Sequence, residues 1–276
     1  MIELGKKRGQ YGGGQASYES VIPLILILIL AIFIAGKFGI LNLSSLPVVG
    51  SLFGAPYIKV LVIGTPSAQL EQMLQAEDFR VAGITYAGSI RQETIYPGTL
   101  DNFDIVILDN TRTCDRTVRK VVADKVKAGG KLIVIADACT TVNDDPNAVG
   151  WDIGIGTLGD VMPVKYGGIL FHEPTGTTTS TVSGKFKAIA FDNPIFNGLK
   201  NFQFSGPVTK VYPNPNSNVL AYIDNWGNRV TSPADFAIIE SKGLLTGKVI
   251  YFSFYPDTTS RNMLRNTLLY VKGAKG

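Results

Sequence analysis

The stretch DIVILDNTRTCDRTVRKVVADKVKAGGKLIVIADAC, residues 104–139, decides the fold class of this chain. Its two ends are continuously apolar runs, which is typical of strands buried on both faces. The segment between them carries valines at helical spacing on one face and closes with Gly129-Gly130, a helix-terminating pair. The valines on that face are Val118, Val121, Val122 and Val126. A strand, a helix and a second strand in this order predict two neighbouring parallel strands.

The same alternation precedes this stretch. YIKVLVIG (57–64) reads as a buried strand, SAQLEQMLQAE (67–77) as a helix with Ser67 as its N-cap, and VAGITYAG (81–88) as a second strand. We therefore expect a parallel sheet covered by helices on both faces.

The second half of the chain has a different pattern. Short strands separated by turns predominate, and one helix, roughly Ser260–Val271, closes the chain. We expect an antiparallel region docked on the parallel sheet, within one domain that spans 57–276. The predicted strands of this half are FKAIAF (186–191), GPVTKVY (206–212), NVLAYI (218–223), DFAIIES (235–241) and KVIYFSFYP (248–256).

Composition excludes several functions. The chain has 276 residues, 45% of them hydrophobic, and a net charge of +4 that is concentrated near the N-terminus. Acidic and basic residues nearly balance from Tyr57 onward, so the sequence predicts no nucleic-acid partner. Two cysteines and one histidine exclude a Cys-rich zinc site, and no carboxylate cluster has metal-loop spacing. We expect neither a metal nor a cofactor.

The N-terminal region carries a predicted membrane anchor. Residues 21–41 are almost continuously apolar and long enough to cross a bilayer. Lys6, Lys7 and Arg8 lie before this span, which places residues 1–20 in the cytoplasm and 57–276 outside. Residues 42–56 form a connector. The expected location is the cell membrane, crossed once, with lipid as a partner; a cleaved secretory signal is the alternative.

A second signal overlaps this anchor. The stretch GQASYE (14–19) resembles the archaeal class III, type IV pilin-like signal. The resemblance implies cleavage after Gly14, with Gln15 as the new first residue and Glu19 as the fifth. In such filaments the carboxylate meets the N-terminal amine of a neighbouring subunit, so a homo-oligomer or filament partner is implied. Two further glycines separate the basic triplet from Gly14, which departs from the usual pattern, and an ordinary anchor with an interfacial Glu19 is the alternative.

The outer domain also resembles a known superfamily. Four segments follow, in order, the pattern of class I glutamine amidotransferase-like proteins, and of the ThuA-like branch above all. This resemblance implies a flavodoxin-like, mostly parallel sheet with antiparallel additions. The segments are DIVILDN (104–110), GGKLIVIADA (129–138), NPIFNGLKNF (193–202) and GKVIYFSFYPDTTSRNMLRNTLLYV (247–271).

Candidate binding residues follow from the fold. Ligand sites of open parallel sheets lie at the carboxyl ends of the strands. The side chains expected there are Thr65, Asp109, Asn110, Asp137, Tyr255 and Asp257. Asp109 and Asp137 could bind a cation or a sugar hydroxyl together, or could merely cap the segments that follow them. The basic group Arg112, Arg116, Arg119 and Lys120 marks either an anion site or a solvated helix face.

The catalytic residues of the superfamily are incomplete in this chain. The resemblance implies a Cys nucleophile on a sharp turn after one strand and a His-x-Glu pair after the last. Cys139 falls near the turn, but Tyr255-Pro256-Asp257 occupies the place of His-Pro-Glu, and a tyrosine cannot replace histidine as a base near neutral pH. Cys139, Asp109 and Asp137 remain weak catalytic candidates.

The two cysteines offer another reading. Cys114 and Cys139 follow strands that we expect to be neighbours, so a disulfide between them is feasible outside the cell. Two free, partly buried thiols are the alternative. We expect a non-catalytic binding or structural module. The alternatives are an enzyme of the hydrolase or amidotransferase type that uses Cys139 or the strand-end carboxylates, and a pilin-like filament subunit.

Overall fold

The computed structural model divides the chain into two compact units, Met1–Pro56 and Tyr57–Gly276. Within the described residues, no helix has the length and apolar character that a membrane crossing requires. The expected anchor (21–41) and the candidate signal residues Gly14, Gln15 and Glu19 lie outside the described residues, apart from three isolated positions. The residues that the structure describes are 57–154, 156–167, 179–199, 202–224, 236–242, 247–258 and 260–273, together with Pro23, Ile27 and Leu30.

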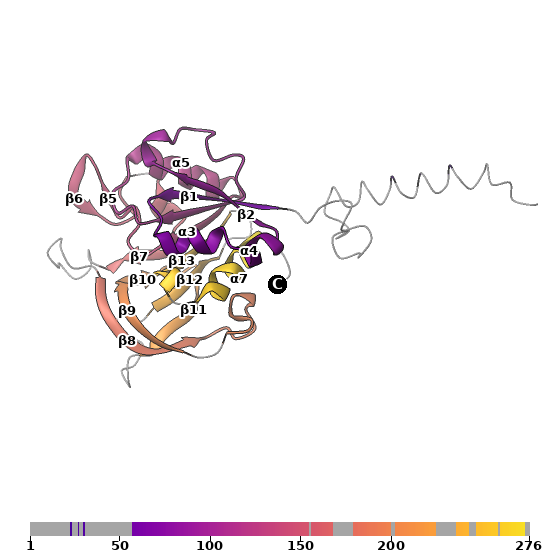
Figure 1. Cartoon of the computed structure of the whole chain (residues 1–276). Coiled ribbons are helices and arrows are strands. Elements are labelled where there is room, and N and C mark those ends of the chain that lie inside the picture. The colour runs from indigo at the N-terminus through magenta and orange to yellow at the C-terminus, as the bar shows by residue number, and fades with distance from the viewer. Residues whose placement is uncertain are drawn as a thin grey trace, which may run out of the picture. The chain divides into compact units, whose positions relative to one another are not determined.

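A nine-stranded sheet forms the centre of the second unit, in the order β2-β1-β3-β4-β13-β12-β11-β8-β9 (Figure 1). The first five strands are parallel, as the sequence predicts, and the remaining four pair antiparallel. The parallel strands are β1 (Ile58–Gly64), β2 (Ile84–Ile90), β3 (Ile105–Asp109), β4 (Lys131–Ile135) and β13 (Lys248–Phe252). The antiparallel strands are β8 (Thr179–Ala188), β9 (Gln203–Thr209), β11 (Ser217–Asp224) and β12 (Phe236–Ser241).

The antiparallel region extends the sheet and does not dock on its face. Strand β13 pairs with β4 on one side and with β12 on the other, so it joins the two halves through backbone hydrogen bonds. Two further two-stranded sheets lie outside the main one. Their strands are β5 (Thr141–Val142) with β6 (Asp145–Val149), and β7 (Val164–Tyr166) with β10 (Val211–Pro213).

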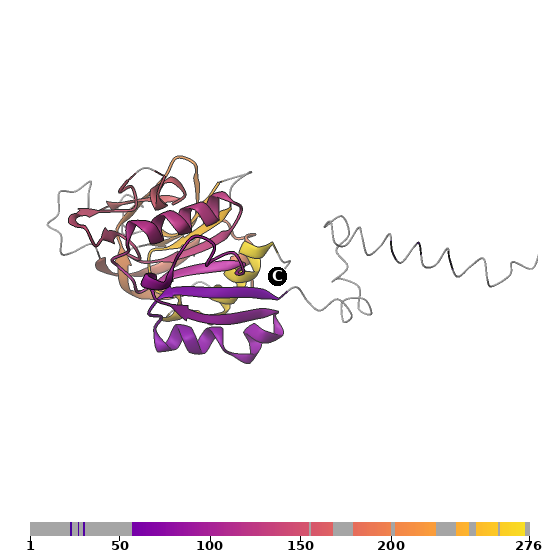
Figure 2. The same cartoon turned by 90° about the horizontal axis from the view of Figure 1, so that it is seen from above.

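Helices cover both faces of the parallel half (Figure 2). On one face, α3 (Ala68–Leu74), α4 (Glu77–Val81) and α7 (Arg261–Lys272) pack on the sheet. On the other face lies α5 (Arg116–Lys127), with its predicted valines buried. Short 3-10 turns complete the described elements: η2 (Gln92–Thr94), η3 (Leu158–Asp160), η4 (Pro194–Phe196) and η5 (Pro256–Thr258).

Three elements differ from the sequence prediction. The helix expected over 67–77 is divided, because Ala76 has an extended backbone and begins α4 as its N-cap. Strand β4 ends at Ile135, and not at Cys139, because Ala136 adopts a left-handed φ of 52° that turns the chain. The strand expected over 186–191 belongs to the longer β8, which ends at Ala188.

Candidate functional site

The candidate site lies at the edge of the sheet where β1, β3, β4 and β13 end. Because these strands are parallel neighbours, the residues that follow each of them gather at this edge. The backbones approach one another closely there. A Cβ at Gly64 would lie 2.1 Å from the main-chain oxygen of Asp109, and Gly64 has a φ of 117°, so only glycine fits at the end of β1.

Two buried carboxylates lie close together at this edge. Asp109 ends β3 and is 1% exposed, while Asp257 follows β13 and is 5% exposed. Burial, and then the charge of Asp257, raise the pKa of Asp109 to about 7, against the backbone N–H groups of Ser67 and Asn110 that favour its ionised form. The Oδ1 atom of Asp109 is buried and lacks a hydrogen-bond partner among the described residues. This carboxyl group can therefore gain or lose a proton near neutral pH.

The other predicted side chains surround this pair. The Asn110 side-chain amide donates to the main-chain oxygen of Thr65 at 3.0 Å, which ties the end of β3 to the end of β1. Tyr255 is half-buried, and its pKa is raised to about 12 by burial and by the charges of Asp137, Asp109 and Asp257. A hydroxyl that keeps its proton to such high pH donates hydrogen bonds and does not serve as a base near neutral pH.

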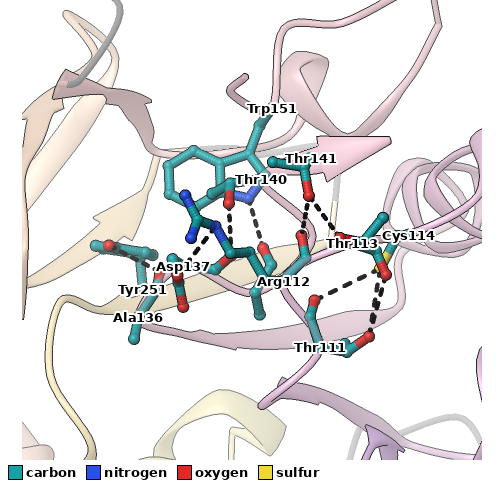
Figure 3. Close-up of polar contacts among 11 residues, drawn as sticks. Thr111, Arg112, Thr113, Cys114, Ala136, Asp137, Thr140, Thr141, Trp151 and Tyr251 are labelled. Carbon is teal, nitrogen blue, oxygen red and sulfur yellow. Dashed lines mark hydrogen bonds and ion pairs between the residues drawn. The ribbon is translucent and has the colours of Figure 1, made fainter. Parts of the chain in front are cut away.

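Asp137 forms an ion pair with Arg112. Its Oδ2 atom lies 3.6 Å from Nε of Arg112, and the two side chains are 20% and 41% exposed (Figure 3). The structure thus does not show Asp109 and Asp137 as a shared cation site. Among the described residues, no three His, Cys, Asp or Glu side chains are grouped so that they could hold a metal ion.

A disulfide joins Cys114 and Cys139 in the loops at this rim, beside Asp137. Their Cα atoms lie 4.9 Å apart. Backbone hydrogen bonds join the same two loops, from Cys139 N to Thr111 O at 2.7 Å and from Cys114 N to Thr141 O at 3.0 Å. The hydroxyl groups of Thr113 and Thr141 also form a hydrogen bond, at 2.7 Å (Figure 3). Cys139 is therefore not a free thiol in this structure and offers no nucleophile.

The sharp turn after β4 is occupied by Ala136. It is the first residue beyond the strand, and its left-handed φ is a conformation that few residues other than glycine adopt. In the amidotransferase-like superfamily the nucleophile is expected on a turn of this kind. A methyl group here cannot attack a substrate. Cys139 also has a left-handed backbone, with a φ of 55°, so two of the four residues in ADAC share this conformation and the sequence does not distinguish them from their neighbours.

A buried network beneath the rim was not predicted from the sequence. Arg119 is fully buried and donates through Nη2 to the main-chain oxygens of Gly150 and Trp151, at 2.8 and 2.7 Å. The Trp151 indole N–H donates to Ala138 O at 2.8 Å, and the Tyr251 hydroxyl donates to Ala136 O at 3.0 Å (Figure 3). These bonds fix the turn after β4 from below. The sequence assigns Arg119 to an anion site or to a solvated helix face, because its long-range partners cannot be seen in sequence.

The basic side chains at the start of α5 pair with groups inside the domain. Arg116 Nε donates to Asp144 at 2.7 Å, and Lys120 Nζ donates to Asp124 at 2.9 Å. With Arg112 beside Asp137 and Arg119 buried, these cations have partners within the domain. The residue His172 lies outside the described residues.

This arrangement is an α/β domain whose fold is similar to that of ThuA-like proteins. No protein-family model and no curated protein matches the chain. Solved structures do. The chain is similar to cytoplasmic protein STM3548 from Salmonella typhimurium, with 15% identity, a TM-score of 0.55 and coverage of 77% of this chain and 98% of that one.

Two further structures show how widely this fold occurs. A ThuA-like protein from Bacteroides uniformis shares 15% identity, with a TM-score of 0.51 and coverage of 79% of this chain and 92% of that one. A β-galactosidase from Rahnella sp. R3 shares 12% identity and a TM-score of 0.51, over 81% of this chain but 33% of its own. At these identities the likeness concerns the fold alone. The β-galactosidase comparison adds that a similar fold is found as one part of a longer chain.

Proposed function

We propose that this chain is a single-pass membrane protein with a cytoplasmic N-terminus, and that its ThuA-like domain lies outside the cell as a non-catalytic binding or structural module. The observation that carries the non-catalytic part is the state of the turn after β4. The sulfur of Cys139 is bonded to Cys114, and the first residue of the turn, Ala136, has only a methyl side chain. Thiol chemistry needs a thiolate and a base that lowers its pKa, and Tyr255 is no such base.

The membrane part rests on the sequence of residues 1–56. The apolar span 21–41 meets the length of a bilayer core, and the basic triplet before it favours a cytoplasmic N-terminus. A disulfide between Cys114 and Cys139 suits an extracytoplasmic domain, because such bonds persist in oxidising compartments.

Two measurements on the full-length protein in its membrane test these parts separately. Protease added to intact cells should digest the domain and leave residues 1–20 intact. Digestion of the domain only in ruptured cells would reverse the proposed orientation. Ammonia release from glutamine by the purified protein, with and without reductant, should stay at the background level; release that depends on Cys139 would refute the non-catalytic proposal.

A second candidate function is favoured by one observation, the buried pair of Asp109 and Asp257. Two carboxyl groups of which one titrates near neutral pH are a common arrangement for general acid–base chemistry. An enzyme of the hydrolase type would use this pair in place of Cys139. A hydrolytic activity that is lost in Asp109→Asn and retained in Cys139→Ser would establish this alternative.

The third candidate, a pilin-like filament subunit, depends on the segment 14–19. Its test is the mass of the mature protein. A chain that begins at Gln15 would support assembly through the N-terminal helix, and a chain that retains Lys6, Lys7 and Arg8 would leave only the anchor.

A further inference from the structure

Three lysines converge at the opposite edge of the sheet, where the parallel strands begin. Lys131 is the first residue of β4 and Lys248 the first residue of β13, and the two are direct neighbours in the parallel register. Lys272 ends α7 beside them. Like charges that lie directly opposite one another in a sheet are destabilising. Lys248 is held within the fold by Glu240 and by the ring of Tyr270, so it is the lysine beside it, Lys131, that suggests a role outside the fold.

Two carboxylates lie within this cluster. Lys248 Nζ lies 2.9 Å from Oε1 of Glu240, which also accepts a hydrogen bond from the Tyr270 hydroxyl at 2.8 Å. Lys272 forms an ion pair with Asp104. Among the described residues, no carboxylate forms an ion pair with Lys131. Its pKa is lowered by burial and then by Lys248 and Lys272, as expected for one cation pressed between two others.

The positive surface extends from this centre toward the start of β1. Asp104 accepts the backbone N–H of Lys59 at 2.9 Å, and Lys125 acts on the same carboxylate. The Lys59 side chain is exposed. Five lysines therefore lie around two carboxylates, Asp104 and Glu240. The lysines come from β1, β4, β13, α5 and the last turn of α7, and both carboxylates already have partners. Figure 2 shows the yellow end of α7 beside the indigo start of β1.

The place where the chain enters the domain indicates which kind of partner this edge contacts. Residue 57, at which the chain enters the domain, directly precedes β1, so the predicted connector 42–56 joins the domain at the edge that carries the lysines. The Tyr57 side chain is 62% exposed, and tyrosine is enriched at the interface between membrane and water. Lysines held close to a membrane surface are attracted to anionic lipids in the leaflet that they face, over about a Debye length.

We infer that the amino-terminal edge of the sheet, with Lys131, Lys248 and Lys272 at its centre, binds the phosphate headgroups of anionic lipids. The inference rests on the proposed membrane anchoring. The site supplies ammonium donors from three elements, and no carboxylate among the described residues pairs with Lys131, so a phosphate diester can accept hydrogen bonds there. Binding there would hold the domain against the bilayer with the opposite, strand-end rim directed away from it.

The test uses the full-length protein in nanodiscs of phosphatidylcholine and in nanodiscs of equal parts phosphatidylcholine and phosphatidylglycerol. Lysine acetylation is measured peptide by peptide with mass spectrometry. We expect acetylation of Lys131, Lys248 and Lys272 to slow at least threefold in the anionic nanodiscs at low salt and to recover at high salt, since screening weakens such contacts. The exposed Lys185 on β8 should react equally in both.

A single substitution makes the result specific. Lys131→Gln removes the lysine that pairs with no carboxylate in the described part of the chain, so it should leave folding intact while it reduces the protection of Lys248 and Lys272. Equal acetylation in both nanodiscs would overturn the inference, and so would protection by inorganic phosphate in nanodiscs without anionic lipid, which would identify a free-phosphate site. A protein that enters neither nanodisc would instead refute the proposed anchoring.

Discussion

Ser67 and Asp257 lie 190 residues apart in sequence, yet the Ser67 hydroxyl donates a hydrogen bond to the Asp257 carboxylate. The same hydroxyl oxygen accepts the backbone N–H of Leu70 at 2.9 Å, as the N-cap of α3. The neighbouring Gln69 side chain donates to the main-chain oxygen of Asp257 at 2.9 Å. One serine therefore begins a helix and fastens it to the loop that follows β13.

We expect Ser67→Ala to destabilise the domain by about 2–3 kcal/mol, because the helix loses its cap and a buried carboxylate loses a donor. Urea denaturation of the full-length protein in detergent measures the change. Ser205→Ala is the matched control. The Ser205 hydroxyl on β9 forms an exposed hydrogen bond with Ser183 on β8, and its loss should cost under about 0.5 kcal/mol. Equal effects of the two substitutions would show that the bond to Asp257 contributes nothing.

Asp109 should make the stability depend on pH. Its pKa in the folded state, about 7, exceeds the value in an unfolded chain, so the folded state retains a proton that the unfolded state has released. This contribution is fully present below about pH 4 and is lost as the pH rises toward about 7. A shift of about three units corresponds to at most about 4 kcal/mol.

Asp109→Asn should therefore be more stable relative to wild type at about pH 8 than at about pH 5, with a difference of roughly 2–4 kcal/mol. Denaturation midpoints at the two pH values provide the measurement. Asp192→Asn, at an exposed position, should leave the pH profile of the wild type unchanged. If the stability of Asp109→Asn changed with pH in the same way as that of the wild type, the Asp109 carboxyl group would be ionised throughout this range.

The disulfide should stabilise the domain without supporting any activity. It joins residues separated by 25 positions, for which loop closure predicts about 3 kcal/mol. Reductant, or the double substitution Cys114→Ser and Cys139→Ser, should lower the unfolding midpoint accordingly, and ammonia release from glutamine should stay at background. The mass of the alkylated protein reports whether the bond was present at the start. Activity that appears on reduction would favour the amidotransferase alternative.

The parallel half of the fold could be predicted because its signals are local. Strands β1, β3 and β4 are short, mostly apolar runs, and the valine face of α5 repeats at helical spacing. The antiparallel half was recognised as strands but not placed, since pairing partners such as β8 and β9 are fixed by long-range register. The predicted antiparallel additions are present, and they extend the sheet from β13 through β12.

The candidate site was predictable only as a set of strand-end residues. The sequence indicates that Asp109 and Asp257 both lie at the carboxyl edge, but it cannot show that they approach each other or that Ser67 bonds to one of them. The left-handed backbone at Ala136 carries no signal in the letters around it. Whether the strand-end residues bind a ligand stays a prediction.

Arg119 provides the sharpest test of the network beneath the rim. It is fully buried, burial lowers its pKa to about 10, and its hydrogen bonds to the oxygens of Gly150 and Trp151 leave Nε and Nη1 without described partners. Arg119→Ala removes the donors and leaves a cavity, so we expect a loss of about 3–5 kcal/mol. Arg119→Met fills most of the volume but still leaves the two oxygens unpaired, so its loss should be smaller, at about 2 kcal/mol. Lys120→Ala, which removes only the exposed ion pair with Asp124, should cost under about 0.5 kcal/mol.

The emission of Trp151 gives a second measurement that a general loss of stability would not change. In a Trp226→Phe background, Trp151 is the single tryptophan, and its indole is held by Ala138 O and packs edge-on against Tyr166 and Tyr251. Under native conditions Arg119→Met should shift this emission to longer wavelength, because the backbone of Trp151 is no longer fixed from below. An unshifted spectrum together with a loss of stability would show that Arg119 acts only through packing, and that the turn at Ala136 is held by Tyr251 and the disulfide alone.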